Sequence, residues 1–195
     1  NEGAFTGYDL ILIPTEFVHG GVNVGSQVGP TPTTTPRPTS TPAPTTMPDG
    51  FAVVIDTVPG KAGEQVEIPI RFINIPSSGI NNCDFIVWYD PAVLDVTSIS
   101  PGSIMPGGSL DFKSHINSTD GRLSFMFVDE SGLGHRMIEA EGVFATLTAT
   151  IKSTAPNGLS EITRANEGAF TGYDLILIPT EFVHGGVNVG SQVGP

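Results

Sequence analysis

The sequence predicts an all-β protein, an antiparallel β-sandwich of eight or nine short strands. Three observations lead to this prediction. Short segments in which apolar and polar residues alternate follow one another over most of the chain, with turn residues between them. Gly and Pro are frequent, at 24 and 17 of 195 residues. Good helix formers are sparse. Period-two alternation is typical of strands that bury one face, and many such strands are typical of two packed sheets.

Four strands are expected in the first half of the alternating region. They cover residues 51–58, 63–74, 79–90 and 93–99. A turn at Pro59-Gly60 is expected between the first two strands. Pro91 and Pro101-Gly102 are expected to end the third and fourth strands, because proline cannot donate a hydrogen bond to a sheet ladder.

Five further strands are expected in the second half. They cover residues 109–116, 122–130, 142–153, 173–179 and 181–190. The polar segment NSTDG joins the first two of these strands. The strand over 142–153 alternates cleanly and ends before the turn residues Pro156-Asn157-Gly158.

The chain also contains an identical internal repeat. Residues 1–30 and 166–195 both read NEGAFTGYDLILIPTEFVHGGVNVGSQVGP. An identity of this length does not arise by chance, so we interpret the chain as a window on a longer tandem array with a period of 165 residues.

A Pro/Thr-rich segment lies between the two copies. Its sequence, PTPTTTPRPTSTPAPTTMP, has little apolar surface to bury and favours extended polyproline II structure. We therefore expect four parts in the chain. They are the truncated C-terminal strands of a preceding module at 1–29, a linker at 30–49, a complete module at 50–190 and the start of the next linker at 191–195.

Period-two alternation assigns a face to each strand residue. The positions expected to face the core are Cys83, Phe85, Val87, Tyr89, Leu123, Phe125 and Phe127. The positions expected to face outward are Asn82, Asp84, Ile86, Trp88, Ser124, Met126, Val128 and Glu130. In the strand over 173–179, Ile176 and Ile178 are expected to be buried, which leaves Leu175 and Leu177 outside.

Three strands thus carry apolar residues on a face that should contact water, beside the polar Asn82 and Asp84. If these strands adjoin, they form an apolar patch with a polar rim, which is typical of a protein interface. The alternative is that scattered apolar residues on a surface carry no function.

Composition and charge exclude several function classes. The formal net charge of -12 and the pI of about 4.4 argue against binding to nucleic acid or to an anionic membrane. A single cysteine excludes an intramolecular disulfide and a Cys-based zinc site. The sequence has no apolar run of the ~18 residues that a membrane span needs, and its first 30 residues lack a signal-peptide pattern.

No motif points to an enzyme, a metal site or a cofactor. Asp129 and Glu130 are adjacent on a strand and would point to opposite faces, so they cannot act as a glycosidase carboxylate pair. We expect them at a solvated strand end. Cys83 is expected to be a buried, inert thiol. No zinc-protease or calcium-loop spacing occurs.

Four segments carry a family resemblance. They are GINNCDFIVWYDPAVLDV, FMFVDESGLG, GVFATLTATIKS and EFVHGGVNVG. In this order, over Phe51–Gly190, the sequence resembles the type I cohesin module of cellulosomal scaffoldins. NCDF followed by YDP, together with the closing GGVNV, are the specific signatures. The tandem period and the Pro/Thr-rich linker also suit a scaffoldin.

The resemblance implies a nine-stranded jelly-roll sandwich without catalytic activity. It implies that the chain binds dockerin modules of cellulases and related glycoside hydrolases and so assembles the cellulosome for plant polysaccharide degradation. Calcium is expected on the dockerin partner, and neither a metal nor a cofactor on this chain. The expected location is extracellular, secreted or attached to the cell surface, with adjacent cohesin modules in tandem.

The resemblance and the alternation together predict the dockerin-binding residues. They are Asn82, Asp84, Ile86, Asn117, Met126, Val128, Asp129, Gly132, Leu175 and Leu177. Asp129 stands where the family usually has Glu, Asn117 where Tyr is often found, and Lys113 where an acid is sometimes found. These departures imply a dockerin specificity different from that of better-known type I pairs.

Two other functions are compatible with a sandwich fold. A carbohydrate-binding module would need a flat row of exposed aromatic side chains, for which Trp88 is the only outward candidate on the predicted strands. A purely structural cell-surface repeat would need no binding face. Binding to calcium-loaded dockerins and to crystalline cellulose distinguishes all three.

Overall fold

The computed structural model of the 195-residue chain describes residues 48–106, 111–131, 136–165 and 168–190. The expectations for residues 1–29 and for nearly all of the linker lie outside this part of the chain. Every regular element in the described part is a strand, so it holds no helix long and apolar enough to cross a membrane.

Twelve strands are formed by the described residues. In chain order they are β1 (Ala52–Ile55), β2 (Thr57–Gly60), β3 (Gln65–Ile73), β4 (Asn82–Trp88), β5 (Leu94–Pro101), β6 (Phe112–Asn117), β7 (Arg122–Val128), β8 (Gly142–Ile151), β9 (Gly158–Arg164), β10 (Ala169–Thr171), β11 (Glu181–Val183) and β12 (Gly185–Val189).

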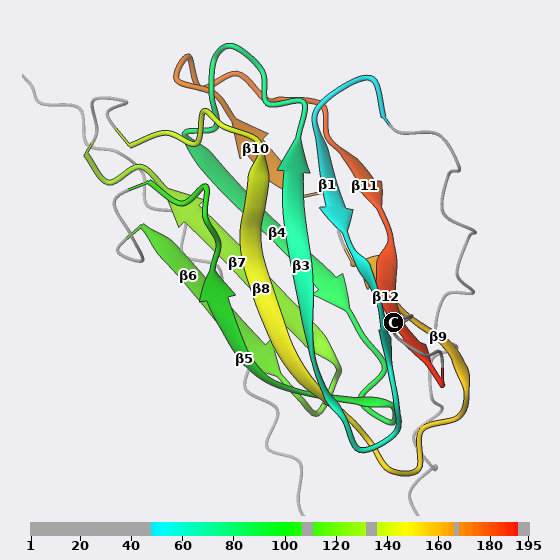
Figure 1. Cartoon of the computed structure of the whole chain (residues 1–195). Helices are drawn as coiled ribbons and strands as arrows, with labels where there is room; N and C mark the ends of the chain where they lie inside the picture. Colours follow the sequence, from blue (N-terminus) through cyan, green and yellow to red (C-terminus); the bar gives the residue numbers. More distant parts are fainter. Residues whose placement is uncertain (1–47, 107–110, 132–135, 166–167, 191–195) are drawn as a thin grey trace, which may run out of the picture. The chain divides into compact units, whose positions relative to one another are not determined.

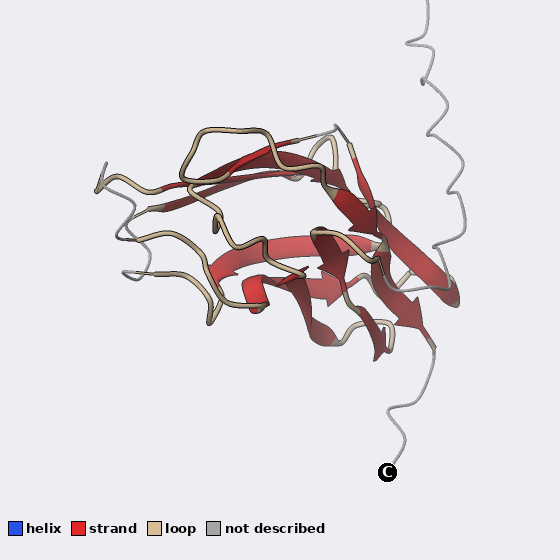
Figure 2. Cartoon of the chain, turned by 90° about the horizontal axis from the view of Figure 1, so that it is seen from above, coloured by secondary structure: helices blue, strands red, loops and turns tan. Residues whose placement is uncertain are grey.

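These strands form two sheets that lie face to face (Figure 1; Figure 2). One sheet has the order β11-β1-β3-β8-β5, and the other has the order β2-β12-β9-β4-β7-β6, with β10 paired to β4. The pairs β1·β11 and β2·β12 are parallel, and the remaining pairs are antiparallel. The all-β sandwich is therefore confirmed, but its sheets are mixed rather than purely antiparallel. Twelve strands stand where nine were expected, and the jelly-roll topology stays a prediction.

The sheets enclose a core that is rich in phenylalanine. All the core-facing positions predicted from alternation in β4 and β7 are buried. Phe85 stacks on Phe125 with ring centroids 4.8 Å apart, and Phe72 stacks on Phe144 at 4.2 Å. The Phe85 and Phe144 centroids are 5.7 Å apart, so the two stacks join the sheets. Burial of each ring stabilises the folded state by about 1.5–3 kcal/mol. Packing in the core therefore holds β4 and β7 in place.

Two segments of the chain pass side by side from one sheet to the other. β1 continues into β2 at Asp56, and β11 continues into β12 at His184. A Cβ at Gly185 would lie 1.9 Å from the carbonyl oxygen of Ile55, so only glycine fits at this crossing. Gly186 has a φ of 149°, which residues with a side chain rarely adopt. Backbone geometry therefore requires both glycines of the closing GGVNV segment.

Two sequence expectations for this region are wrong. The turn expected at Pro59-Gly60 does not form, because both residues lie in β2. β2 is an edge strand, where proline is tolerated, and the turn comes later, with Glu64 N donating to Lys61 O at 2.9 Å. The strand expected over 173–179 is a looped segment instead, in which Leu175 has a φ of 61°. Ile176 is consequently exposed rather than buried.

Two further strands, β9 and β10, are not among those expected from the sequence. The inward side chains of β9 include Ser160 beside Ile162, so its apolar alternation is weak. β10 has only three residues and is too short for a periodic signal. Both strands form hydrogen-bonded pairs with β4. β10 pairs with the half of β4 that contains Asn82 and Asp84.

Candidate functional site

The register between β4 and β7 brings four of the predicted binding residues together. Asn82 lies opposite Val128, and Asp84 lies opposite Met126. Directly opposed residues share one face of a sheet, with Cβ atoms about 4.5–5.5 Å apart. Because Cys83 and Phe127 point into the core, these four side chains point away from it. They form the centre of a candidate binding face on the outer side of the larger sheet.

Neighbouring strands extend this face in both directions. β10 places Thr171 opposite Asn82 and Ala169 opposite Asp84. An isolated bridge then places Leu177 opposite Thr171, which brings the predicted Leu177 onto the same face. On the other side, β6 places Lys113 opposite Met126.

Two rows therefore cross the face. One row is Leu177, Thr171, Asn82 and Val128, and the other is Ala169, Asp84, Met126 and Lys113. We call the residues of these two rows the binding face. Thr171 and Ala169 were not identified from the sequence, because β10 was not recognised.

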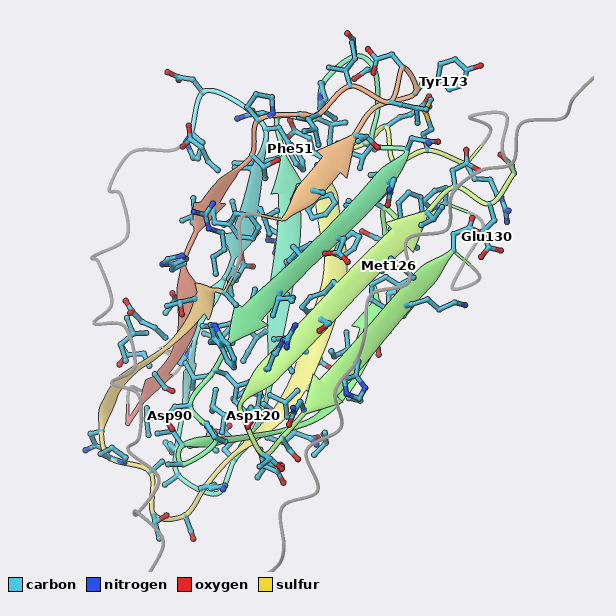
Figure 3. The ribbon with its side chains drawn as sticks, turned by 180° about the vertical axis from the view of Figure 1, so that it is seen from behind. Phe51, Asp90, Asp120, Met126, Glu130 and Tyr173 are labelled. Carbon is cyan, nitrogen blue, oxygen red and sulfur yellow. The ribbon has the colours of Figure 1, made fainter. Side chains whose placement is uncertain are left out.

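The binding face is accessible, and its central strands are fixed. Asp84 is exposed, Met126 is 41% exposed, and Asn82 and Val128 are half-buried. Ile86, also predicted to bind, follows on β4 opposite Ser124 and is half-buried. In Figure 3, Met126 lies on this face, and the labelled Tyr173 and Glu130 lie toward the same end of the sandwich.

Asn117 lies at the other end of the same sheet. It is opposite Arg122, which is opposite Trp88. Trp88 is four residues beyond Asp84, roughly 13 Å along the strand. The Asn117 side chain donates to Asp120 Oδ2 at 2.8 Å and accepts from Asp120 N at 3.2 Å within the β6–β7 turn. The structure therefore does not bring Asn117 together with the binding face.

Asp129 is buried, with 5% exposure, and the solvated strand end expected there is wrong. Its Oδ1 accepts hydrogen bonds from both Ser131 N, at 2.8 Å, and the Ser131 hydroxyl, while its Oδ2 accepts from Arg136 N at 3.2 Å. Burial alone would raise the pKa of the Asp129 carboxyl. The hydrogen bonds from Ser131 and Arg136 and the Arg136 charge outweigh burial and lower this pKa. Asp129 thus connects Ser131 with Arg136, two described residues that follow β7.

A second buried acid contacts the same Arg136. Asp111 is fully buried, and its Oδ2 lies 3.2 Å from Nη1 of Arg136. The carbonyl of Asp111 also accepts from Val128 N at 3.1 Å, beside the binding face. Sequence reasoning missed this cluster because the two partners lie 25 positions apart in the chain. Gly132, predicted to bind, lies outside the described residues.

The last predicted residue, Leu175, lies in the segment between β10 and β11. It is highly exposed, as is Leu177. The buried thiol of Cys83 has its pKa strongly raised by burial, and the prediction that this cysteine is buried is confirmed.

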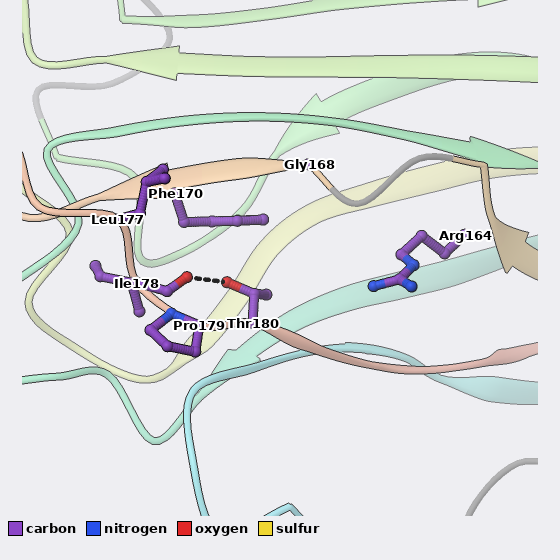
Figure 4. A pocket seen from close by; sticks show the side chains of 7 residues that line it. All are labelled: Arg164, Gly168, Phe170, Leu177, Ile178, Pro179 and Thr180. Carbon is purple, nitrogen blue, oxygen red and sulfur yellow. Dashed lines mark hydrogen bonds between the residues drawn. The ribbon is translucent and has the colours of Figure 1, made fainter.

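A pocket of about 390 Å³ opens on the flank of the sandwich (Figure 4). Its lining is mixed, with the apolar Phe170, Leu177 and Ile178 beside the polar Arg164 and Thr180. A neighbouring groove of about 420 Å³ shares Arg164 and Thr180 and adds three side chains. They are Glu181, Phe182 and His184.

These side chains are engaged with one another. The Arg164 guanidinium lies 5.3 Å from the centre of the Phe182 ring, and Arg164 N donates to His184 Nε2 at 3.3 Å. Burial lowers the pKa of His184, which keeps the acceptor nitrogen neutral. The described residues contain no group of three or more His, Cys, Asp or Glu side chains placed to hold a metal ion.

Comparison with known proteins assigns the family. Residues 51–189 match the family model described as the cohesin domain. The chain is 44% identical to cellulosomal-scaffolding protein A of Acetivibrio thermocellus over 196 aligned residues, which cover 99% of this chain and 10% of that protein. It is 40% identical to cellulosomal-scaffolding protein B of Acetivibrio thermocellus over 74% of this chain and 19% of that protein. The chain thus spans between a tenth and a fifth of these relatives.

Solved structures agree with this assignment. The seventh ScaB type I cohesin of Pseudobacteroides cellulosolvens has a TM-score of 0.68 and 34% identity, covering 74% of this chain and 95% of that one. A type I cohesin–dockerin complex from Clostridium thermocellum gives a TM-score of 0.67 and 33% identity, covering 72% and 93%. The domain of this chain therefore belongs to the cohesin family.

Proposed function

We propose that this chain is a non-catalytic cohesin that binds dockerin modules of cellulases and related glycoside hydrolases. One observation carries the proposal: the register places polar Asn82 and Asp84 between Val128 and Met126 on one side and Thr171 and Leu177 on the other. A few polar groups surrounded by apolar contacts on a rigid surface are typical of interface centres.

The comparisons support the same partner. The similar solved structures include type I cohesin–dockerin complexes, and the relatives include cellulosomal scaffolding proteins. In this proposal, cohesins in tandem hold several enzymes in one extracellular assembly, the cellulosome. The Pro/Thr-rich linker acts as a spacer, and calcium belongs to the dockerin.

Titration calorimetry of the chain with calcium-loaded type I dockerins tests this function. We expect one-to-one binding that is lost when a chelator removes calcium. The thermal melt of the cohesin chain alone should not change with chelator, because calcium is assigned to the partner. A large drop in that melting temperature would show that the chain itself holds a structural calcium ion.

The same experiment separates dockerin binding from carbohydrate binding. Among the described residues of β4, Trp88 is the aromatic side chain on the outer face, and it is half-buried. Tyr173 is exposed but lies toward the other end of the sandwich (Figure 3). Retention on crystalline cellulose, combined with no heat of binding for any dockerin tested, would contradict the proposed function.

A further inference from the structure

The segment between β10 and β11 exposes an unusual number of large apolar side chains. Tyr173, Leu175, Ile176 and Leu177 have exposed fractions of 61%, 71%, 64% and 68%. They are four of the six large hydrophobic residues exposed in the described part of the chain. Clustered exposed apolar side chains cost solvation free energy and typically mark an interaction site. We call residues 173–177 the apolar loop.

The apolar loop is held in place by hydrogen bonds. Leu175 N donates to Gly172 O at 3.0 Å, and Ile176 N donates to Asp174 Oδ1 at 3.0 Å. Tyr173 N donates to Ser78 O at 3.3 Å, which ties the loop to the segment before β4. The four apolar side chains are therefore presented on an ordered backbone.

Leu175 has a φ of 61°, in the left-handed region. Residues other than glycine, asparagine and aspartate rarely adopt this region, and an outlier that persists is often found at a functional site. Glycine would adopt this backbone without strain. Leucine at this position is therefore better explained by what its exposed side chain contacts than by the turn itself.

The apolar loop is continuous with the binding face. Leu177 lies opposite Thr171, which lies opposite Asn82. A partner that covers Asn82 and Val128 would therefore also reach Leu177 at the end of the same row. A second copy of the chain is a poorer occupant, because each chain carries a net charge of -12 and two copies repel each other.

We propose that the apolar loop determines which dockerins this cohesin binds. It would select dockerins that present apolar side chains next to the groups that meet Asn82 and Asp84. It would reject dockerins that place a charge there, because a charge buried against leucine and isoleucine loses its water without gaining a partner. This inference rests on the proposed function and adds to it the basis of partner choice.

The test uses a calcium-loaded dockerin that binds the wild-type chain and a variant of that dockerin with one apolar contact residue changed to Asp. Calorimetry with the double variant Tyr173→Ser/Ile176→Ser should show at least about tenfold weaker binding of the parent dockerin. The affinity ratio between the two dockerins should fall toward one. Leu159→Ser is the matched control, because Leu159 is exposed on β9, away from the binding face.

Leu175→Gly separates a binding role from a structural one. It removes the side chain and relieves the backbone, so the melting temperature should stay the same or rise while dockerin affinity falls. A lower melting temperature with unchanged affinity would overturn the proposal, as would an unchanged affinity ratio in the double variant. If no dockerin binds the wild-type chain, the proposed function fails first, and this inference fails with it.

Discussion

Asp129 shows how a residue next to a binding face can act through the backbone. Sequence alternation alone places it at a wet strand end, yet it is buried and accepts three hydrogen bonds from Ser131 and Arg136. Any contribution to dockerin binding would therefore come from holding Ser131 and Arg136 in place. Asn82 and Asp84, in contrast, have the outward orientation that alternation predicts.

Asp129→Asn should destabilise the chain at neutral pH. An amide NH₂ would then face Arg136 N or Ser131 N, so at least one buried hydrogen bond is lost, at about 1–3 kcal/mol of the free energy of unfolding. The folded-state pKa of Asp129 is lowered. The stability that comes from its charge is therefore present above the unfolded pKa of about 4 and is lost as pH falls through the folded value.

Denaturant unfolding of wild type and Asp129→Asn between pH 7 and pH 2.5 measures this difference. The gap in unfolding free energy should be constant near neutrality and should narrow below about pH 4. Glu67→Gln, at an exposed position on β3, is the control and should show no comparable gap. A gap that stays the same down to pH 2.5 would mean that the Asp129 charge is not involved.

At the scale of elements, the paired crossing of β1–β2 and β11–β12 joins the two sheets. Gly185 allows the strands to approach closely at this point. We expect Gly185→Ala to cost about 3 kcal/mol or more, because the new Cβ would overlap a backbone carbonyl that cannot move without disturbing β1.

Thermal and denaturant unfolding of Gly185→Ala check this expectation. Gly50→Ala is the matched control, since a Cβ there meets no atom within 4 Å. Equal stability of the two variants would contradict the crossing as the structure shows it.

Much of the element pattern could be predicted from local sequence. In β4 and β7 every second residue is apolar and buried, so alternation identifies both the strands and their outward residues. Alternation cannot assign faces in the run Leu175–Ile178, because consecutive apolar residues have no period. The positive φ of Leu175 also turns the chain there. β10 and the Asp111–Arg136 contact could not be predicted, because they depend on partners distant in the sequence.

At the scale of the whole module, the first and last described residues lie beside the β1–β2 crossing. Pro48 O accepts a hydrogen bond from Asn74 beside the start of β1, and Gly190 N donates to Gly60 O at the end of β2. The entry and exit points thus lie near opposite ends of the β1–β2 crossing. Among the described residues, none covers Asp84 or Met126 on the outer face of β4 and β7, so both are open to a partner.

The central claim is that this outer face binds dockerin through Asn82 and Asp84. Calorimetry of Asp84→Ala against a calcium-loaded dockerin tests it most directly, with Glu67→Ala on the other sheet as the acidic control. We predict that Asp84→Ala weakens binding by about 2–5 kcal/mol, because a dockerin group would be buried without its partner. Its melting temperature and the affinity of Glu67→Ala should match those of the wild type. Wild-type affinity in Asp84→Ala and Asn82→Ala, with normal melting, would contradict the claim.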